Sequence, residues 1–512
     1  MAKFAKLPWN GKGCLKDFSQ EHRFLLKPTL ILSVIIVVSI SAILMADYNY
    51  IDDVLRVNFG GRYFTTFGRY ISEYLSVLIH GDTYLTDISP LPQILAGCIV
   101  AAASAIVLHV LTGKKEFTFW EYAAVLPLAL SPYFLQCLSY KYDSPYMALS
   151  ILGSVAPLLL RNKDVKAYAA AIVVGMLVMC TTYQAASGIF PLMVMVLCLK
   201  KWNEKEDFKE ILKFAAISAG AYLVGLLIFR FGIYQPSDSY AGAETGEMGL
   251  LLTMARNLIQ YYSMVVFDFK ASWNVLVILL GISFLAVSVI TSKRNKLATF
   301  GITCLILVLM LLLCFGAFAF IESTLFEPRA MYGFGAMLAI MAVFVVSSGA
   351  LKATRLVCFA LSWVFISFAF TYGNALEEQK EYTDFRITSV IEDLKDWEGF
   401  TAENNYRMRI SGAAGYAPTN DKIYKENNIL VRLVLPTFID SRVSMFSGLD
   451  LIYFYGLNNV SIDIVYDVQK ENLELLTDNI YDTIWVGGDY IWVELKNYNQ
   501  NVAEYFDMLL PE

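Results

Sequence analysis

Long apolar runs recur along the whole chain, separated by short polar connections. Most are about 17–25 residues long, the length that an α-helix needs to cross ~30 Å of hydrocarbon. Two further segments, about 66–80 and 251–268, mix charged and apolar residues, as helices on a membrane surface do. The pattern predicts eleven membrane-spanning helices, at about residues 28–46, 90–111, 118–138, 145–160, 166–181, 185–199, 212–231, 272–291, 298–320, 330–349 and 354–372.

Composition agrees with this interpretation. Of 512 residues, 57% are hydrophobic and 17% are charged, and the mean hydropathy is +0.52. Soluble proteins carry about 25% charged residues. The net charge of −6 is less informative, because charges in a membrane protein sort by side of the membrane. The predicted fold class is therefore an α-helical polytopic membrane protein.

Lysine and arginine are distributed unevenly among the connections. The N-terminal tail is basic, and so is every second connection, near residues 114, 163, 200–213, 293–296 and 352–355. Because short basic loops stay in the cytoplasm, we place the N-terminus and these connections there. The loops 47–89, 139–144, 232–271 and 321–329, and everything after residue 372, then lie outside.

The last part of the chain has a different pattern. Residues 376–397 have helical periodicity, and YRMRISG and TIWVGGDYIWVEL alternate as strands do, the latter around a Gly-Gly turn. We therefore predict three parts: a cytoplasmic tail (1–27), a transmembrane domain (28–372) and an external α/β domain (373–512).

Several classes of function lack their motifs. The sequence has no phosphate-binding glycine loop, no dinucleotide fingerprint and no metalloprotease helix. The eight cysteines show no metal or disulfide spacing, so we expect no zinc, no disulfide and no cofactor. Nothing points to nucleic acid. The cytoplasmic loops are too short for a nucleotide-binding domain, which favours chemistry at the membrane or outside it.

An aspartate pair follows the first apolar run closely. Asp52 and Asp53 stand in a segment, residues 47–70, that also holds Arg56, Arg62 and Arg69. If 50–57 is helical, both aspartates share a face with Arg56. One interpretation is a solvated loop with weak surface ion pairs. The other is a general base with arginines that bind phosphate.

Three more polar groups fall on the predicted external side. Each has an ordinary interpretation: a helix cap for Asp143, an aromatic belt for Tyr183, and snorkelling for Arg329. The functional interpretations are phosphate contacts from lysine and arginine and sugar contacts from tyrosine and glutamine. The candidates are Lys141 and Asp143, then Tyr183 and Gln184, then Glu327 and Arg329.

With these residues in view, the chain resembles the Gtr-type bacterial glucosyltransferases, the serotype-converting enzymes that decorate O-antigen. The similarity is carried, in this order, by YIDDVLR…GR…GRY, SPLPQILA, YKYDSP, TYQAASGIF, EPRAMYG and the late YDTIWVGGDYIWVEL.

The resemblance implies a GT-C type, inverting glycosyltransferase in the bacterial cytoplasmic membrane. Its donor would be a polyprenyl-phosphate-linked hexose, with glucose expected, and its acceptor a cell-surface glycan. It also implies an acidic catalytic residue in the first external loop, which matches Asp52 and Asp53 and leaves open which one is the base. The leaving phosphate would be stabilised by Arg329, Lys141 or one of Arg56, Arg62 and Arg69, without a metal.

Two alternatives remain at this point. The same architecture serves transferases of other lipid-linked groups, such as mannose, arabinose or a phosphoglycan. A lipid or polysaccharide transporter would also bury charges in a helical bundle, but transporters commonly show repeated halves, and we find no repeat.

Overall fold

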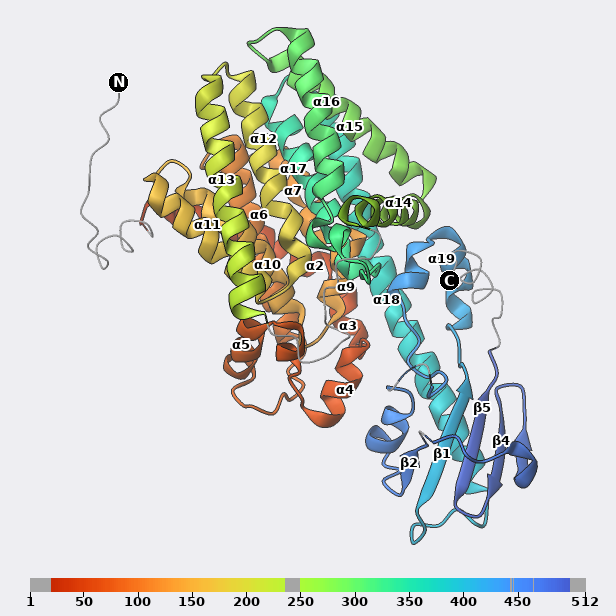
Figure 1. Ribbon diagram of the computed structural model, residues 1–512. Coiled ribbons are helices and arrows are strands. Elements are labelled where there is room, and N and C mark those ends of the chain that lie inside the picture. Colours follow the sequence, from red (N-terminus) through yellow and green to blue (C-terminus); the bar gives the residue numbers. More distant parts are fainter. Residues whose placement is uncertain (1–19, 235–248, 443, 445, 464, 498–512) are drawn as a thin grey trace.

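The computed structural model describes residues 20–234, 249–442, 444, 446–463 and 465–497 (Figure 1). Predictions that concern residues 1–19, 235–248 and 498–512, including the first lysines of the N-terminal tail and Cys14, lie outside the described residues. A large helical bundle comes first along the chain, and a smaller five-stranded sheet lies beyond its last long helix (Figure 1).

Among the described residues, six helices are long and apolar enough to cross a membrane. This supports the predicted helical membrane protein, whereas the count of eleven spans stays a prediction. The six are α6 (Leu91–Thr112), Gln184–Asn203, which includes α12 (Ile189–Asn203), Phe208–Ile233, which includes α13 (Phe208–Ile228), α15 (Ala271–Thr291), α16 (Lys296–Leu313) and α18 (Thr354–Lys395).

The remaining predicted spans are also helical, but shorter or broken. Helices α7 to α9 pass the same test only as a pair bent by 59°. The bend lies at Ser131, whose backbone is extended (ψ 142°) because the following Pro132 disfavours a helical residue before it. The helices that form the remaining predicted spans are α2 (Leu26–Ser39), α3 (Ser41–Ala46), α7 (Phe119–Val125), α8 (Pro127–Leu130), α9 (Pro132–Ser139), α10 (Ser144–Val155), α11 (Val165–Cys180) and α17 (Tyr332–Ser348).

Three helices follow the mixed polar and apolar segments. The expected helix near 50–57 is α4 (Asp52–Phe59), and the two segments predicted to lie on the membrane surface are α5 (Tyr70–His80) and α14 (Leu250–Asp268). Their helical structure is confirmed, and their position at a membrane surface stays a prediction. Helix α4 is short, and it begins directly after Ile51, which has a positive φ of 43°.

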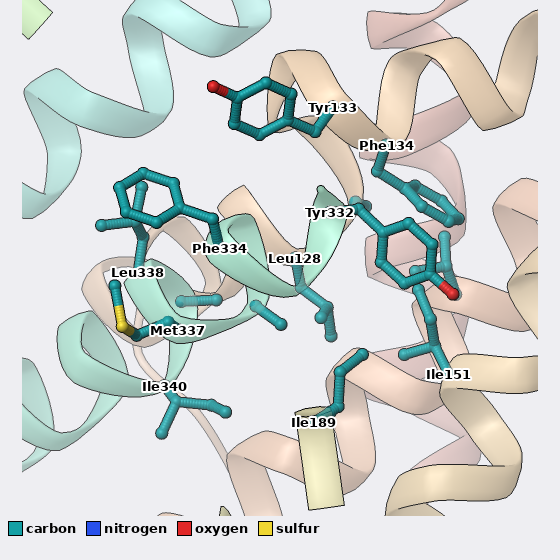
Figure 2. Close-up of a cluster of buried hydrophobic side chains, with 14 of the residues drawn as sticks. Leu128, Tyr133, Phe134, Ile151, Ile189, Tyr332, Phe334, Met337, Leu338 and Ile340 are labelled. Carbon is teal, nitrogen blue, oxygen red and sulfur yellow. The ribbon is translucent and has the colours of Figure 1, made fainter. Parts of the chain in front are cut away.

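The core of the bundle surrounds α17, which is buried along almost its whole length. A helix that is apolar on all sides must be shielded from water, and here other helices enclose it. The first turn of α17 packs on α9: the Phe134 and Tyr332 ring centroids are 5.4 Å apart, and those of Tyr133 and Phe334 are 6.3 Å apart (Figure 2). The loop that precedes α17 is thereby fixed against α9.

Helix α18 crosses α3 closely at a glycine. A Cβ atom at Gly373 would lie 2.4 Å from the backbone nitrogen of Ile43, so a larger residue there would push the helices apart. Because α3 leads directly into the segment with the aspartate pair, this crossing also positions that segment.

The predicted boundary at residue 372 falls inside α18, which continues unbroken to Lys395. Its last turns cover one face of the sheet through Ile387, Val390 and Leu394. The predicted strands are confirmed, including the hairpin. The sheet order is β2-β1-β5-β4-β3, with β1 parallel to β2 and β5 and the other pairs antiparallel; the strands are β1 (Tyr406–Gly412), β2 (Val460–Ile462), β3 (Glu474–Asp478), β4 (Asp482–Gly487) and β5 (Tyr490–Leu495).

Two short helices, α19 (Asp421–Glu426) and α20 (Ile429–Leu433), lie between β1 and β2 in the sequence. They leave the sheet and pack on the bundle, where Leu430 and Leu433 belong to the same buried cluster as the membrane helices. In Figure 1, α19 lies close to the end of α14.

Candidate active site

The predicted site segments meet at one end of the bundle, and the basic connections meet at the other. At the first end, the Ile71 N–H donates to the Thr181 carbonyl (3.1 Å). Helix α6 runs from this end to the other. There, Lys200 Nζ donates to Leu111 O (2.9 Å), the Lys293 N–H donates to Asn203 O (2.8 Å), and Lys163 pairs with Glu21 (2.8 Å).

Asp53 is fully buried and fastens two segments together. Its Oδ2 accepts hydrogen bonds from the backbone N–H groups of Tyr50 (3.1 Å) and Lys141 (3.0 Å). Burial raises the pKa of its carboxyl group to about 8, and the Lys141 N–H and the Arg56 charge oppose that shift only partly. Asp53 is therefore mainly protonated at neutral pH.

Asp52 has a different environment, although it is the adjacent residue. It is half-buried, and within the described residues its carboxylate makes no hydrogen bond or ion pair. Its charge interacts with the guanidinium groups of Arg56 and Arg329 and with Asp143. Asp52 is thus a carboxylate beside two arginines with its oxygens available to another group.

Arg56 and Asp143 form a buried ion pair. The distance from Arg56 Nη1 to Asp143 Oδ1 is 2.8 Å, and the side chains are 6% and 4% exposed. Arg56 also lies over the ring of Phe64, at 4.8 Å from its centroid. Asp143 does precede α10, but its side chain makes no capping hydrogen bond. The pair joins α4 to α10.

Lys141 is buried and already neutralised. Its ammonium group pairs with Asp47 at 2.5 Å and with Asp87 at 3.2 Å. The predicted contact from Lys141 to phosphate would have to replace one of these partners. The geometry therefore favours a structural position for Lys141, where it joins the loops before α4 and before α6.

Arg329 stands in the loop before α17. Its guanidinium group donates to the Tyr140 hydroxyl, and its backbone N–H donates to Gln136 Oε1. Glu327, at the start of the same loop, is half-buried, and it interacts electrostatically with Arg329. Within the described residues Arg329 has no carboxylate within ion-pair distance.

Arg69 and Tyr183 lie together beside this group. The Arg69 guanidinium carbon is 4.6 Å from the centroid of the Tyr183 ring, and Tyr183 stacks on Tyr332 at 6.1 Å. Like Arg329, Arg69 forms no ion pair in the described part of the chain.

The last two predicted residues support the loops. Gln184 donates to the Phe67 carbonyl (3.1 Å), which holds the turn before α5. Arg62 pairs with Glu73 of α5 at 3.1 Å. Neither is among the groups that surround Asp52.

Sequence reasoning missed three polar residues of this site. Tyr50, Gln136 and Tyr140 are all fully or almost fully buried. Gln136 Nε2 donates to the Tyr50 hydroxyl (2.8 Å), while its Oε1 receives the Arg329 N–H, so it connects two loops. A glutamine inside an apolar segment is itself a signal of function, and Tyr140 stands within the YKYDSP motif.

Buried polar atoms without partners gather here. In the described part of the chain, these include Asp53 Oδ1 and the hydroxyls of Tyr142, Tyr146 and Tyr183. Buried polar groups in proteins are nearly always hydrogen-bonded. Their concentration around the aspartate pair indicates a region that a polar ligand can satisfy.

The groups at this site suit an anion next to a base. Guanidinium groups bind phosphate oxygens in a planar, two-pronged manner. Across residues 20–234, 249–442 and the described positions beyond, no three histidine, cysteine or acidic side chains gather in a way that could hold a metal ion. The seven cysteines described there are unpaired.

Comparison with known proteins identifies the family. Residues 41–340 match the family described as glucosyl transferase GtrII, and that range includes all the site residues described above. A protein of Salmonella phage P22, described as an uncharacterised 55.3 kDa protein in the gtrB 5′ region, is 21% identical over 414 residues. The match covers 77% of this chain and 83% of that protein. No solved structure matches the chain. Because the family match covers more than half of the chain, including the aspartate pair and the loop of Arg329, this protein belongs to the GtrII glucosyl transferase family.

Proposed function

We propose that the protein transfers glucose from a polyprenyl-phosphate carrier to a cell-surface glycan such as O-antigen. The observation that carries this proposal is Asp52, a carboxylate without a protein partner in the described residues, beside the guanidinium groups of Arg56 and Arg329. An acceptor hydroxyl needs a base, and a phosphate leaving group needs a cation. Both occur together at this end of the bundle.

Asp52 is the base in this proposal. It takes the proton from an acceptor hydroxyl, whose oxygen attacks the anomeric carbon of the donor glucose. The bond between that carbon and the phosphate oxygen breaks with inversion, and the carrier leaves as a phosphate monoester. Asp53 is less suited to this role, because its side chain is completely buried and its Oδ2 already accepts hydrogen bonds from two backbone N–H groups.

The ion pairs of the cationic side chains indicate which of these side chains can bind the leaving phosphate. Arg56 is neutralised by Asp143, and Arg62 is paired with Glu73. Lys141 is paired twice. Arg69 and Arg329 lack such partners within the described residues, so we assign the leaving phosphate to them.

We place this end of the bundle on the external side of a bacterial cytoplasmic membrane, with the N-terminus in the cytoplasm. The support is the contact among the basic connections at the opposite end, since short basic loops remain in the cytoplasm. In this orientation residues 28–372 form a GT-C type transmembrane domain and residues 373–512 an external domain. The donor then reaches Asp52 from the outer leaflet.

Transfer by purified protein in lipid vesicles tests this function. The protein is incubated with radiolabelled polyprenyl-phosphate-glucose and O-antigen polysaccharide, and in parallel with a nucleotide-linked glucose. We expect label in the polysaccharide, together with free polyprenyl phosphate, from the lipid donor alone. Transfer from the nucleotide donor, or release of the lipid phosphate without glycan labelling, would contradict the proposal.

A further inference from the structure

One segment of the C-terminal region belongs structurally to the site. Residues 428–435 leave the sheet and bind the bundle at several points. Asn428 Nδ2 donates to Phe267 O at the end of α14 (3.0 Å). Two hydroxyl groups from the segment before α4 donate into the same stretch, from Tyr48 to Leu435 O and from Tyr50 to Leu433 O, both at 2.6 Å.

Arg432 is the centre of this contact. It is 9% exposed and pairs with Asp268, which is almost completely buried at the end of α14. The Tyr133 hydroxyl of α9 donates to the same carboxylate oxygen (3.0 Å). The second arm of the Arg432 guanidinium group donates to the Phe326 carbonyl, directly before Glu327 in the loop that carries Arg329. One side chain therefore joins the segment 428–435, α14 and the Arg329 loop.

A second route connects the same segment to Arg329. Leu433 O accepts from the Tyr50 hydroxyl, which accepts from Gln136 Nε2 (2.8 Å). Gln136 Oε1 in turn accepts the Arg329 backbone N–H. The N–H of Tyr50 donates to Asp53, so this relay also reaches the start of α4.

We propose that Arg432 is a positioning residue for glucosyl transfer. By holding the Phe326 carbonyl and the buried Asp268 at once, it keeps the loop 326–331 closed on α9, so that Arg329 stays beside Asp52. The assignment of Arg329 rests on the proposed function, but the clamp itself does not. The external region is then a structural part of the site.

The two arms of the guanidinium group define the most useful substitution. Arg432→Lys keeps a positive charge for Asp268, so the buried carboxylate retains its ion pair. A lysine ammonium has no planar fork and cannot hold both acceptors in this geometry. The variant therefore removes the bond to Phe326 and leaves most of the fold undisturbed.

The kinetic test uses the vesicle assay with the donor varied. We expect Arg432→Lys to lower kcat about 10-fold and to leave the donor KM within about twofold. The carrier still binds, but a displaced Arg329 stabilises the leaving phosphate less well. Arg442→Lys is the matched control: Arg442 is an exposed arginine of the same region, paired with Asp440, and should retain the wild-type kcat. A wild-type kcat for Arg432→Lys would overturn the proposal.

Hydrogen exchange tests the clamp without any activity. The N–H groups of Ala330 and Met331 are hydrogen-bonded within the loop to Glu327 O and Pro328 O, both at 2.8 Å. We expect peptides covering 321–331 to exchange at least 10-fold faster in Arg432→Lys and in Asp268→Asn, with peptides of α17 and β5 unchanged. Unchanged exchange in 321–331, or faster exchange throughout α17 and β5, would contradict the clamp. If the wild type transfers no glucose, the proposed function fails, whereas this result still decides the clamp.

Discussion

The two ends of the helical bundle use charge in different ways. At the basic end, apart from the buried Glu121 that pairs with Lys114, charged side chains are partly exposed and satisfy helix ends, as when Lys296 Nζ donates to the Val289 and Ile290 carbonyls at the end of α15. At the other end, Arg56, Asp143 and Asp53 are almost completely buried. Exposed charges are inexpensive and mark a side of the membrane. Buried charges are costly, and a cluster of them with perturbed pKa values indicates a functional site.

The largest expected effect is loss of the proposed base. Asp52→Asn should lower kcat by about 10²–10⁴-fold, the contribution of a positioned general base, without changing the melting temperature appreciably. Asp53→Asn is the comparison. Its amide oxygen can still accept from Tyr50 and Lys141, so we expect it to keep at least about a tenth of the rate. Equal losses in the two variants would remove the distinction between the adjacent carboxyl groups.

Breaking the buried ion pair should destabilise the protein more than breaking an exposed one. Arg56→Gln leaves Asp143 buried without its charge partner, which typically costs about 3–5 kcal/mol. Lys163→Gln, which breaks the exposed pair with Glu21 at the basic end, should cost less than about 1 kcal/mol. Reversible unfolding in detergent measures both. Similar losses would mean that the two ends do not differ energetically.

A smaller effect is expected from Arg329. Arg329→Gln keeps a hydrogen-bond donor near Tyr140 but removes the charge that would meet the leaving phosphate. Loss of one such group typically costs about 10²–10³-fold in kcat. The rate with a donor whose leaving phosphate is more acidic should fall less. An unchanged rate for both donors would assign phosphate stabilisation to another residue.

A pH dependence of stability is also expected from Asp53. Its carboxyl pKa is about 8 in the folded protein and near the ordinary 3.8 when unfolded, so the folded state binds more protons between these values. Stability should therefore decrease as pH rises from about 5 to 8, by at most about 1.4 kcal/mol per pH unit. Asp53→Asn should flatten this slope in an unfolding series, and an unchanged slope would contradict the assigned pKa.

Sequence reasoning found the segments of the site because apolar periodicity and charge are local properties. It could not choose between Asp52 and Asp53. Successive residues on a helix point about 100° apart, so the choice depends on where α4 begins. Helix α4 begins directly after Ile51, which has a positive φ. An isoleucine in the sequence does not predict that backbone conformation.

Long-range contacts explain the other differences. Lys141 was a candidate for phosphate, but its partners Asp47 and Asp87 come from distant loops. Arg432 lies in the C-terminal region, 164 residues from Asp268 along the chain, and no local sequence pattern connects the two residues. The boundary at 372 was the end of the last apolar run, yet α18 continues through it because its later turns pack on the sheet.

The most direct test of the proposed site is to locate the donor on the protein. A polyprenyl-phosphate-glucose carrying a photoreactive group on its sugar is bound in vesicles, activated by light, and mapped by mass spectrometry of the labelled peptides. We expect labels within 47–70, 139–146 and 322–332, competed away by the unmodified donor. Competable labels at the basic end, within 112–117, 204–207 or 349–353, would contradict it.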